Sequence, residues 1–208
     1  MVSFIFATNR PWDQFGSKIV ESIRSVEKAQ HEIVVCATYR MPDYENVRFV
    51  LDEKNDGSTS AVNAAAEKSV GDWVLLTCDD HYLNPSFSSK LLRSDKEMKV
   101  INLGIKWSDC VCVGGQVYTY PVIPFPAIHR DTLKKLGGFF NPAMRHHFVG
   151  HWLGLWLLAN GHQCDFNALG EFPMWHCTPN AYSECGRDDL DRSEFERLVP
   201  KAKGANYI

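Results

Sequence analysis

Residues 71–81 read GDWVLLTCDDH, an apolar run that ends on two adjacent carboxylates. The segment Trp73–Thr77 has the length and the continuous apolar character of a strand that is buried on both faces. Asp79 and Asp80 follow it, and adjacent carboxylates are unfavourable unless water or a cation neutralises them. Oxygen ligands of this kind suit Mg²⁺ or Mn²⁺. An acidic turn that caps a helix near Pro85 is the alternative interpretation of the same residues.

Strand-like and helix-like segments alternate around this run. We expect strands over Val2–Thr8, Glu32–Tyr39, Val47–Leu51 and Trp73–Thr77, a helix capped by Asp13 and a second helix over Ser60–Lys68. This order predicts an α/β fold with a mostly parallel central sheet. Ligands bind beyond the carboxyl ends of such strands. The polar groups of Thr8–Arg10, Cys36–Thr38 and Asp79–His81 follow three of the strands, so we expect them to converge at one edge.

The second half of the chain is less regular. We expect strands over Val100–Ile105 and Cys110–Tyr118, interruptions at Pro121, Pro124 and Pro126, a short helix over Arg130–Leu136, a buried helix over Leu153–Ala159 and an exposed charged helix over Asp188–Lys203. The predicted organisation is a single domain over residues 1–180, followed by a charged C-terminal tail or helix over residues 181–208.

Composition excludes several classes of protein. The net charge of −3 and the pI near 6.2 argue against a nucleic-acid backbone as the main partner. No apolar stretch reaches the length of a membrane span, and the N-terminus lacks the features of an export signal. The seven cysteines are scattered, so we expect reduced thiols and a cytoplasmic location. No glycine-rich loop of the Walker or dinucleotide type occurs, which argues against kinases and nicotinamide enzymes.

Several short motifs together resemble a known family. They are Asn9-Arg10-Pro11, Glu21-Ser22-Ile23, Ile33-Val34-Val35, Asn55-x-Gly57-x-x-x-Ala61-x-Asn63, Gly71-Asp72-Trp73-Val74 before Asp79-Asp80, and His129-Arg130-Asp131 with Leu136-Gly137-Gly138-Phe139. Their order and spacing, over roughly residues 3–165, resemble the inverting glycosyltransferases of family 2 and their GT-A relatives. The resemblance implies a GT-A (Rossmann-like) three-layer sandwich with a mostly parallel central sheet.

The same resemblance implies roles for individual residues. It places Thr8, Asn9 and Arg10 in the nucleobase and ribose pocket, Asn55, Gly57 and Asn63 in the loop beside the nucleotide, Asp79 and Asp80 on the metal and the donor phosphates, and His176 as a further metal ligand. Asp80 is also a catalytic candidate. The implied cofactor is Mn²⁺ or Mg²⁺, and an imidazole ligand suits Mn²⁺ better. For His176, packing against Trp175 is an equally open interpretation.

The sequence also departs from the family pattern. Cys36-Ala37 replaces an acidic residue, Thr77 stands where the acidic motif usually begins, and Val62 replaces an arginine. The acidic pair expected near Val149-Gly150-His151-Trp152, which supplies the base of inverting relatives, is missing. His151 is the favoured catalytic base because it is the histidine nearest in sequence to the missing carboxylate, with His147 and His146 as alternatives. A retaining mechanism without such a base, or a donor-binding protein with little activity, would also account for the missing pair.

The expected function is the metal-assisted transfer of a sugar from a UDP- or GDP-sugar to a hydroxyl acceptor. The acceptor is unidentified; nucleic acid is not expected unless a modified base is the acceptor. A catalytically inactive nucleotide-sugar-binding domain is one alternative. A nucleotidyltransferase is another, although Thr8–Pro11 lacks the glycine-rich basic loop that such enzymes need after the first strand.

Overall fold

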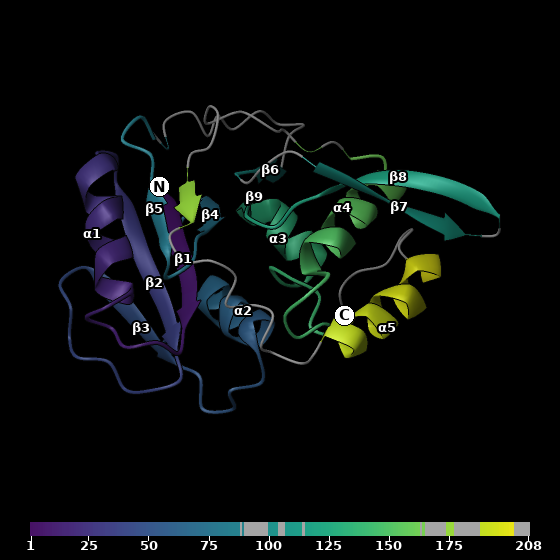
Figure 1. Cartoon of the computed structure of the whole chain (residues 1–208). Helices are drawn as coiled ribbons and strands as arrows, with labels where there is room; N and C mark the ends of the chain where they lie inside the picture. The colour runs from purple at the N-terminus through teal and green to yellow at the C-terminus, as the bar shows by residue number, and fades with distance from the viewer. Residues whose placement is uncertain are drawn as a thin grey trace.

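A mixed β-sheet forms the centre of the protein. The computed structural model describes residues 1–87, 89, 100–103, 107–113, 115–162, 164, 174–176 and 188–201. The strands of the sheet are β1 (Val2–Thr8), β2 (His31–Ala37), β3 (Val47–Leu51), β4 (Trp73–Leu76), β6 (Val100–Asn102) and β9 (Pro126–His129). They lie in the order β3-β2-β1-β4-β9-β6 (Figure 1). Strands β1 to β4 are parallel to one another, whereas β9 is antiparallel to both of its neighbours, β4 and β6. The predicted α/β fold with a mostly parallel sheet is confirmed.

Helices cover both faces of this sheet because alternate side chains of each buried strand point to opposite faces. The helices are α1 (Gly16–Val26), α2 (Ser58–Lys68), α3 (Arg130–Leu136), α4 (Val149–Ala159) and α5 (Asp188–Leu198). On one face, Phe4 and Phe6 pack in a cluster with Ile19 of α1. On the other, Ile5 packs in a cluster with Trp152 of α4. Figure 1 shows α1 on one side of the sheet and α2, α3 and α4 on the other.

Two smaller antiparallel pairs extend the fold. Strand β5 (His81–Leu83) pairs with β10 (Met174–His176), and β7 (Trp107–Val113) pairs with β8 (Gln116–Val122). The strand predicted over Cys110–Tyr118 is therefore divided between β7 and β8. The chain turns back at Gly115, whose φ of +80° favours glycine, and the glycines at 114 and 115 had suggested a bend there. In Figure 1 the β7–β8 hairpin projects beyond α4.

Some local predictions are corrected. Asp13 does not cap the first helix: α1 begins at Gly16, its N-cap residue is Phe15, and that position has no side-chain cap. Turns anchored on the Pro11 carbonyl delay the helix start. The prolines at 121 and 126 do not interrupt structure, since Pro121 lies within β8 and Pro126 opens β9, a position that proline tolerates.

The helix predicted near the C-terminus is present, but it is not simply exposed. Helix α5 spans Asp188–Leu198 and continues as a 3-10 turn over Val199–Lys201, while residues 202 and 203 lie outside the described part. Asp191, Phe195 and Val199 recur every fourth residue and are all buried. This face packs against the body of the protein. No helix in the described part of the chain combines the length and the apolar character needed to cross a membrane.

Candidate functional site

The carboxyl ends of β1 and β4 meet at the same edge of the sheet, and polar side chains from both lie in contact there. The Thr8 hydroxyl donates a hydrogen bond of 2.6 Å to Oδ2 of Asp79. The Arg10 guanidinium donates a hydrogen bond of 3.1 Å to Oδ2 of Asp80 and lies 3.5 Å from Oδ1 of Asp79. Thr8, Arg10, Asp79 and Asp80 therefore lie together at this edge, as the sequence predicted. Exposed Asn9 lies between Thr8 and Arg10 in the chain.

The carboxyl group of Asp79 is enclosed by side chains that follow from the end of β1. One carboxylate oxygen of Asp79 faces Thr8, the last residue of β1, and the other faces Arg10, two residues beyond it. Burial raises the pKa of Asp79 above its ordinary value; the Thr8 hydrogen bond and the Arg10 charge oppose this, and the neighbouring charge of Asp80 adds to it. A cation at this edge would favour the ionised form of such a carboxyl group.

Arg10 is itself held in place from two sides. Its guanidinium lies over the ring of Phe15, 4.9 Å from the ring centroid. Its carbonyl oxygen accepts a hydrogen bond from the hydroxyl of Tyr39, which follows β2. Burial raises the pKa of Tyr39, so the hydroxyl stays protonated and able to donate. Tyr39 was not among the predicted site residues, although it ends the predicted strand Glu32–Tyr39, just as Thr8 ends the predicted strand Val2–Thr8.

A turn after β4 brings further metal-binding side chains together. Ligand atoms of Cys78, Asp80 and His81 all lie within 4.8 Å of one another. Asp80 was predicted as a metal ligand. His81 was expected at this edge but not as a ligand, and Cys78 was missed. The Asp80 carboxylate and the His81 imidazole fit a divalent cation, but a thiol is not a ligand that Mg²⁺ prefers. The side chain of His176 lies outside the described part, but its backbone in β10 pairs directly opposite His81.

The predicted loop residues after β3 lie at the outer part of the same edge. Asn55 is exposed with a φ of +45°, and Gly57 precedes α2 with a φ of +101°. A Cβ at Gly57 would lie 2.7 Å from the carbonyl oxygen of Arg145, so only glycine fits there. Asn63 binds the protein itself: its amide donates to the Phe140 carbonyl at 2.9 Å and accepts from the Phe140 N–H at 2.8 Å.

His151, the favoured base, lies in the first turn of α4. Its Nε2 is 3.4 Å from Oδ2 of Asp109 in β7, and the rings of Tyr120, Phe148 and Phe195 surround it. Burial lowers the pKa of His151 below its ordinary value; Asp109 opposes the shift and Arg192 of α5 adds to it. The imidazole is therefore neutral at neutral pH and able to accept a proton.

The alternative bases His146 and His147 belong to a segment that α5 fixes. The carboxylate of Asp191 accepts hydrogen bonds of 2.9, 2.7 and 2.7 Å from the backbone N–H groups of Arg145, His146 and His147. Nδ1 of His146 also lies 2.9 Å from the hydroxyl of Ser58. The backbone of this segment is therefore fixed by α5, while the side chain of Arg145 stays exposed.

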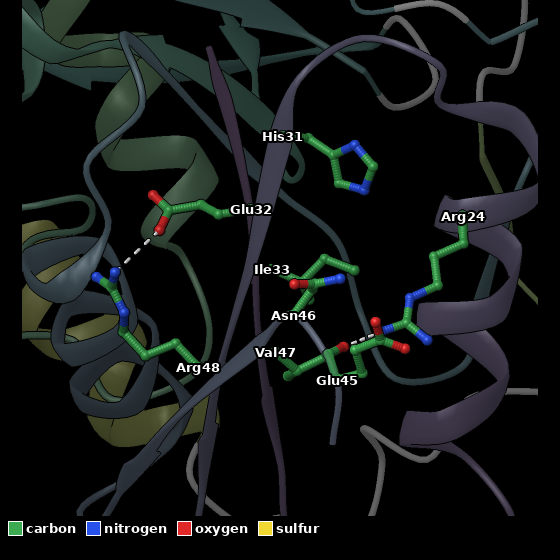
Figure 2. A pocket seen from close by; sticks show the side chains of 8 residues that line it. All are labelled: Arg24, His31, Glu32, Ile33, Glu45, Asn46, Val47 and Arg48. Atoms are coloured by element: carbon green, nitrogen blue, oxygen red, sulfur yellow. Dashed lines mark hydrogen bonds and ion pairs between the residues drawn. The ribbon is translucent and has the colours of Figure 1, made fainter. Parts of the chain in front are cut away.

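A separate groove of about 760 Å³ lies near the amino ends of β2 and β3, away from the site just described (Figure 2). It is lined by Arg24, His31, Glu32, Ile33, Glu45, Asn46, Val47 and Arg48. Figure 2 shows Arg24 of α1 directed at the carbonyl of Glu45, and Arg48 paired with Glu32 at 3.6 Å. None of the predicted site residues lines this groove.

Comparison with known proteins identifies the family. The family model described as glycosyl transferase family 2 matches residues 19–144, more than half of the 208 residues. The chain belongs to glycosyl transferase family 2. No curated protein sequence matches this family 2 chain.

Solved structures share its fold. S. aureus TarS, residues 1–349, is 14% identical with a TM-score of 0.65, and the match covers 97% of this chain and 64% of TarS. TarS has also been solved in complex with UDP and with UDP-GlcNAc. The mannosyltransferase PcManGT from Pyrobaculum calidifontis, in complex with GDP-Man and Mn²⁺, is 14% identical with a TM-score of 0.61, over 96% of this chain and 64% of that one. The expected GT-A fold is confirmed, and the chain spans about 64% of the length of both proteins.

Proposed function

We propose that this family 2 chain transfers a sugar from a UDP- or GDP-sugar to a hydroxyl group with the help of a divalent cation. The observation that carries the proposal is the contact of Thr8 and Arg10 with Asp79 and Asp80 across the joined ends of β1 and β4. The complexes of TarS with UDP-GlcNAc and of PcManGT with GDP-Man and Mn²⁺ support a nucleotide-sugar donor. The proposed catalytic domain is residues 1–180, in the cytoplasm, with the acceptor still to be identified.

The donor would occupy the edge where β1, β3 and β4 end. Thr8, Asn9 and Arg10 would contact the base and ribose, with Asn55 and Gly57 shaping the loop beside them. Asp79 and Asp80 would hold the cation and the donor phosphates, with His176 as a further ligand, and Asp79 would also keep Arg10 in position. A divalent cation supplies positive charge to the departing diphosphate in transfer reactions of this kind.

His151 is the residue that we propose to accept the proton of the acceptor hydroxyl. The acceptor oxygen forms a bond to the anomeric carbon while the bond from that carbon to the diphosphate oxygen breaks. The proton released by the hydroxyl moves to the neutral imidazole of His151, whose charge Asp109 then stabilises. His151, paired with Asp109, would thus serve as the base at the start of α4, where the expected acidic residues are missing.

A domain that binds a nucleotide sugar without transferring it is the second candidate. Gly150 favours it, since this glycine lies where the family pattern expects an acidic residue. A Cβ there would lie 2.7 Å from the carbonyl oxygen of Ile123, so an acidic side chain does not fit without a shift of backbone.

Calorimetric titration of UDP and GDP, with and without Mn²⁺, tests the donor site. We expect binding that requires the cation, loss of binding in Asp80→Ala, and unchanged binding in Glu67→Ala, which removes an exposed carboxylate from the far end of α2. Absence of binding to any nucleoside diphosphate would overturn the proposal. Cation-dependent hydrolysis of the donor, lost in His151→Ala, separates the transferase from the binding-only domain.

A further inference from the structure

The four-residue turn after β4 carries three kinds of metal ligand. The His81 N–H donates to the Cys78 carbonyl at 3.1 Å, which closes a β-turn with Asp79 and Asp80 at its centre. This closure brings together the first and last side chains of the turn. As a result, the thiol of Cys78, the carboxylate of Asp80 and the imidazole of His81 offer ligand atoms within 4.8 Å of one another.

These side chains are held rather than free to move in solvent. Asp80 and His81 are 6% and 3% exposed, and Cys78 is half-buried. The ring of His81 packs edge-on against Phe125, with 4.5 Å between the ring centroids. Packing of this kind fixes the direction of an imidazole and lowers the entropy that ligand binding must overcome. The cluster is therefore largely preorganised.

The sheet register brings the backbone of a second strand next to the cluster. Strand β10 pairs with β5 so that His176 lies opposite His81. Position 176 is thus adjacent to the cluster, on a strand that is far away in sequence.

The chemistry of this set differs from that of the acidic pair alone. Mg²⁺ selects oxygen ligands, whereas a thiolate combined with imidazole selects Zn²⁺ and similar cations. Zinc takes sulfur at about 2.3 Å, and nitrogen or oxygen at about 2.0–2.2 Å, so a modest contraction of the cluster would accommodate it. We propose that Cys78, Asp80 and His81 form a site that binds Zn²⁺ in preference to Mg²⁺. The role of this cation in sugar transfer rests on the proposed function, whereas the binding of the cation does not depend on it.

The charges around the cluster are consistent with such a cation. Asp79 and Asp80 contribute two negative charges, and Arg10, within 3.5 Å of both, contributes one positive charge. Deprotonation of the Cys78 thiol on metal binding adds a further negative charge, which a divalent cation neutralises. Arg10 donates to Oδ2 of Asp80, so it competes with a cation for that oxygen.

Cobalt(II) is the probe for a thiolate ligand, because its absorption spectrum shows a sulfur-to-cobalt charge-transfer band. We titrate the metal-free full chain with Co²⁺ in the absence of nucleotide, then displace it with Zn²⁺ and with Mg²⁺. The expected result is one charge-transfer signal that Zn²⁺ removes and a large excess of Mg²⁺ does not. Cys78→Ser should abolish the band and weaken Zn²⁺ binding at least about tenfold. Cys110→Ser, which alters an exposed thiol of the hairpin, should change neither.

A second variant keeps the test independent of the thiol. His81→Gln should also weaken Zn²⁺ binding, measured by equilibrium dialysis, while circular dichroism verifies that each variant is folded. A band that persists in Cys78→Ser, or displacement of Co²⁺ by Mg²⁺ as readily as by Zn²⁺, would overturn the inference. Binding of UDP or GDP supported by Mg²⁺ in a chain that shows no cobalt band would overturn the zinc site while leaving the proposed function intact. A cobalt band in a chain that binds no nucleotide would support the zinc site and overturn the proposed function.

Discussion

Nε2 of His151 lies 3.4 Å from Oδ2 of Asp109, so the first turn of α4 is paired with the β7–β8 hairpin. The side chain of His151 is 18% exposed and that of Asp109 is 49% exposed, which leaves the carboxylate in contact with water. In the described part of the chain, Tyr120 of β8 lies near this imidazole, and the charge of Arg192 in α5 lowers its pKa. Because Asp109 faces Nε2, the nitrogen of His151 that is left to accept a proton is Nδ1, and the pair makes a pH-dependent prediction possible.

Transfer should depend on the neutral form of His151. Because burial lowers its pKa below 6.5, the rate should stay constant near neutrality and fall as the pH decreases through that lowered pKa. Asp109 raises the pKa, so Asp109→Asn should move the acid limb of kcat/KM to lower pH. The measurement is the pH profile of transfer or donor hydrolysis.

Asp131→Asn is the matched control, since Asp131 is an exposed carboxylate 3.6 Å from another histidine, His129. It should leave the acid limb where it is. If Asp109→Asn reduces the rate equally at every pH, the pair only joins the hairpin to α4 and His151 is not the base.

Asn63 should contribute to stability rather than to nucleotide affinity. Asn63→Leu removes two hydrogen bonds to the backbone of Phe140 and leaves both Phe140 groups without these partners, at a cost of about 2 kcal/mol. Urea unfolding measures this loss, and Glu67→Leu on the exposed side of α2 should stay within about 0.5 kcal/mol of the parent. A tenfold loss of nucleotide affinity at unchanged stability would restore the direct role that the family resemblance implied.

The carboxylate of Asp191 should be a major stabilising group. It accepts from three successive N–H groups and is 2% exposed, so Asp191→Ala should lower the free energy of unfolding by about 3 kcal/mol. For a chain of this size the midpoint of thermal unfolding should fall by roughly 6–12 °C. Glu196→Ala, an exposed change on the same helix, serves as the control. A shift below about 1 °C would mean that α5 contributes nothing to the stability of segment 145–147.

The contact of α4 with β8 should tolerate no side chain at Gly154. A Cβ there would lie 1.5 Å from the carbonyl oxygen of Pro121, a backbone atom, so Gly154→Ala should destabilise the protein by about 3 kcal/mol. Leu158→Ala, an exposed site on the same helix, should cost far less. Chemical unfolding of both variants measures the difference, and equal stability would show that the helix moves away from the strand at little cost.

The part of the site that sequence could predict lies at the ends of long apolar strands. Continuous runs such as Ile33–Val35 identify buried parallel strands, and their carboxyl ends must share one edge. That rule alone brought Thr8 and Arg10 together with Asp79 and Asp80. Tyr39 follows from the same rule, and Cys78 and His81 were within reach too, because the ends of a tight turn are adjacent.

The remaining contacts depend on packing between segments that no local pattern joins. Asp109 meets His151 only because the chain turns at Gly115 and lays the hairpin on α4. Asp191 meets segment 145–147 through a helix whose many charges suggested full exposure. The spacing of Asp191, Phe195 and Val199 by four residues was the available sign of a buried face.

Thr8 and Asp79 are 71 residues apart in the chain, yet they share a hydrogen bond. The unfolded chain does not hold them together, so a ligand that contacts both would bind the native state alone. At a free concentration of one hundred times its Kd, such a ligand adds about 2.7 kcal/mol to the free energy of unfolding. Supply of that ligand would then govern how much folded protein escapes proteolysis, as well as how much reaction it performs.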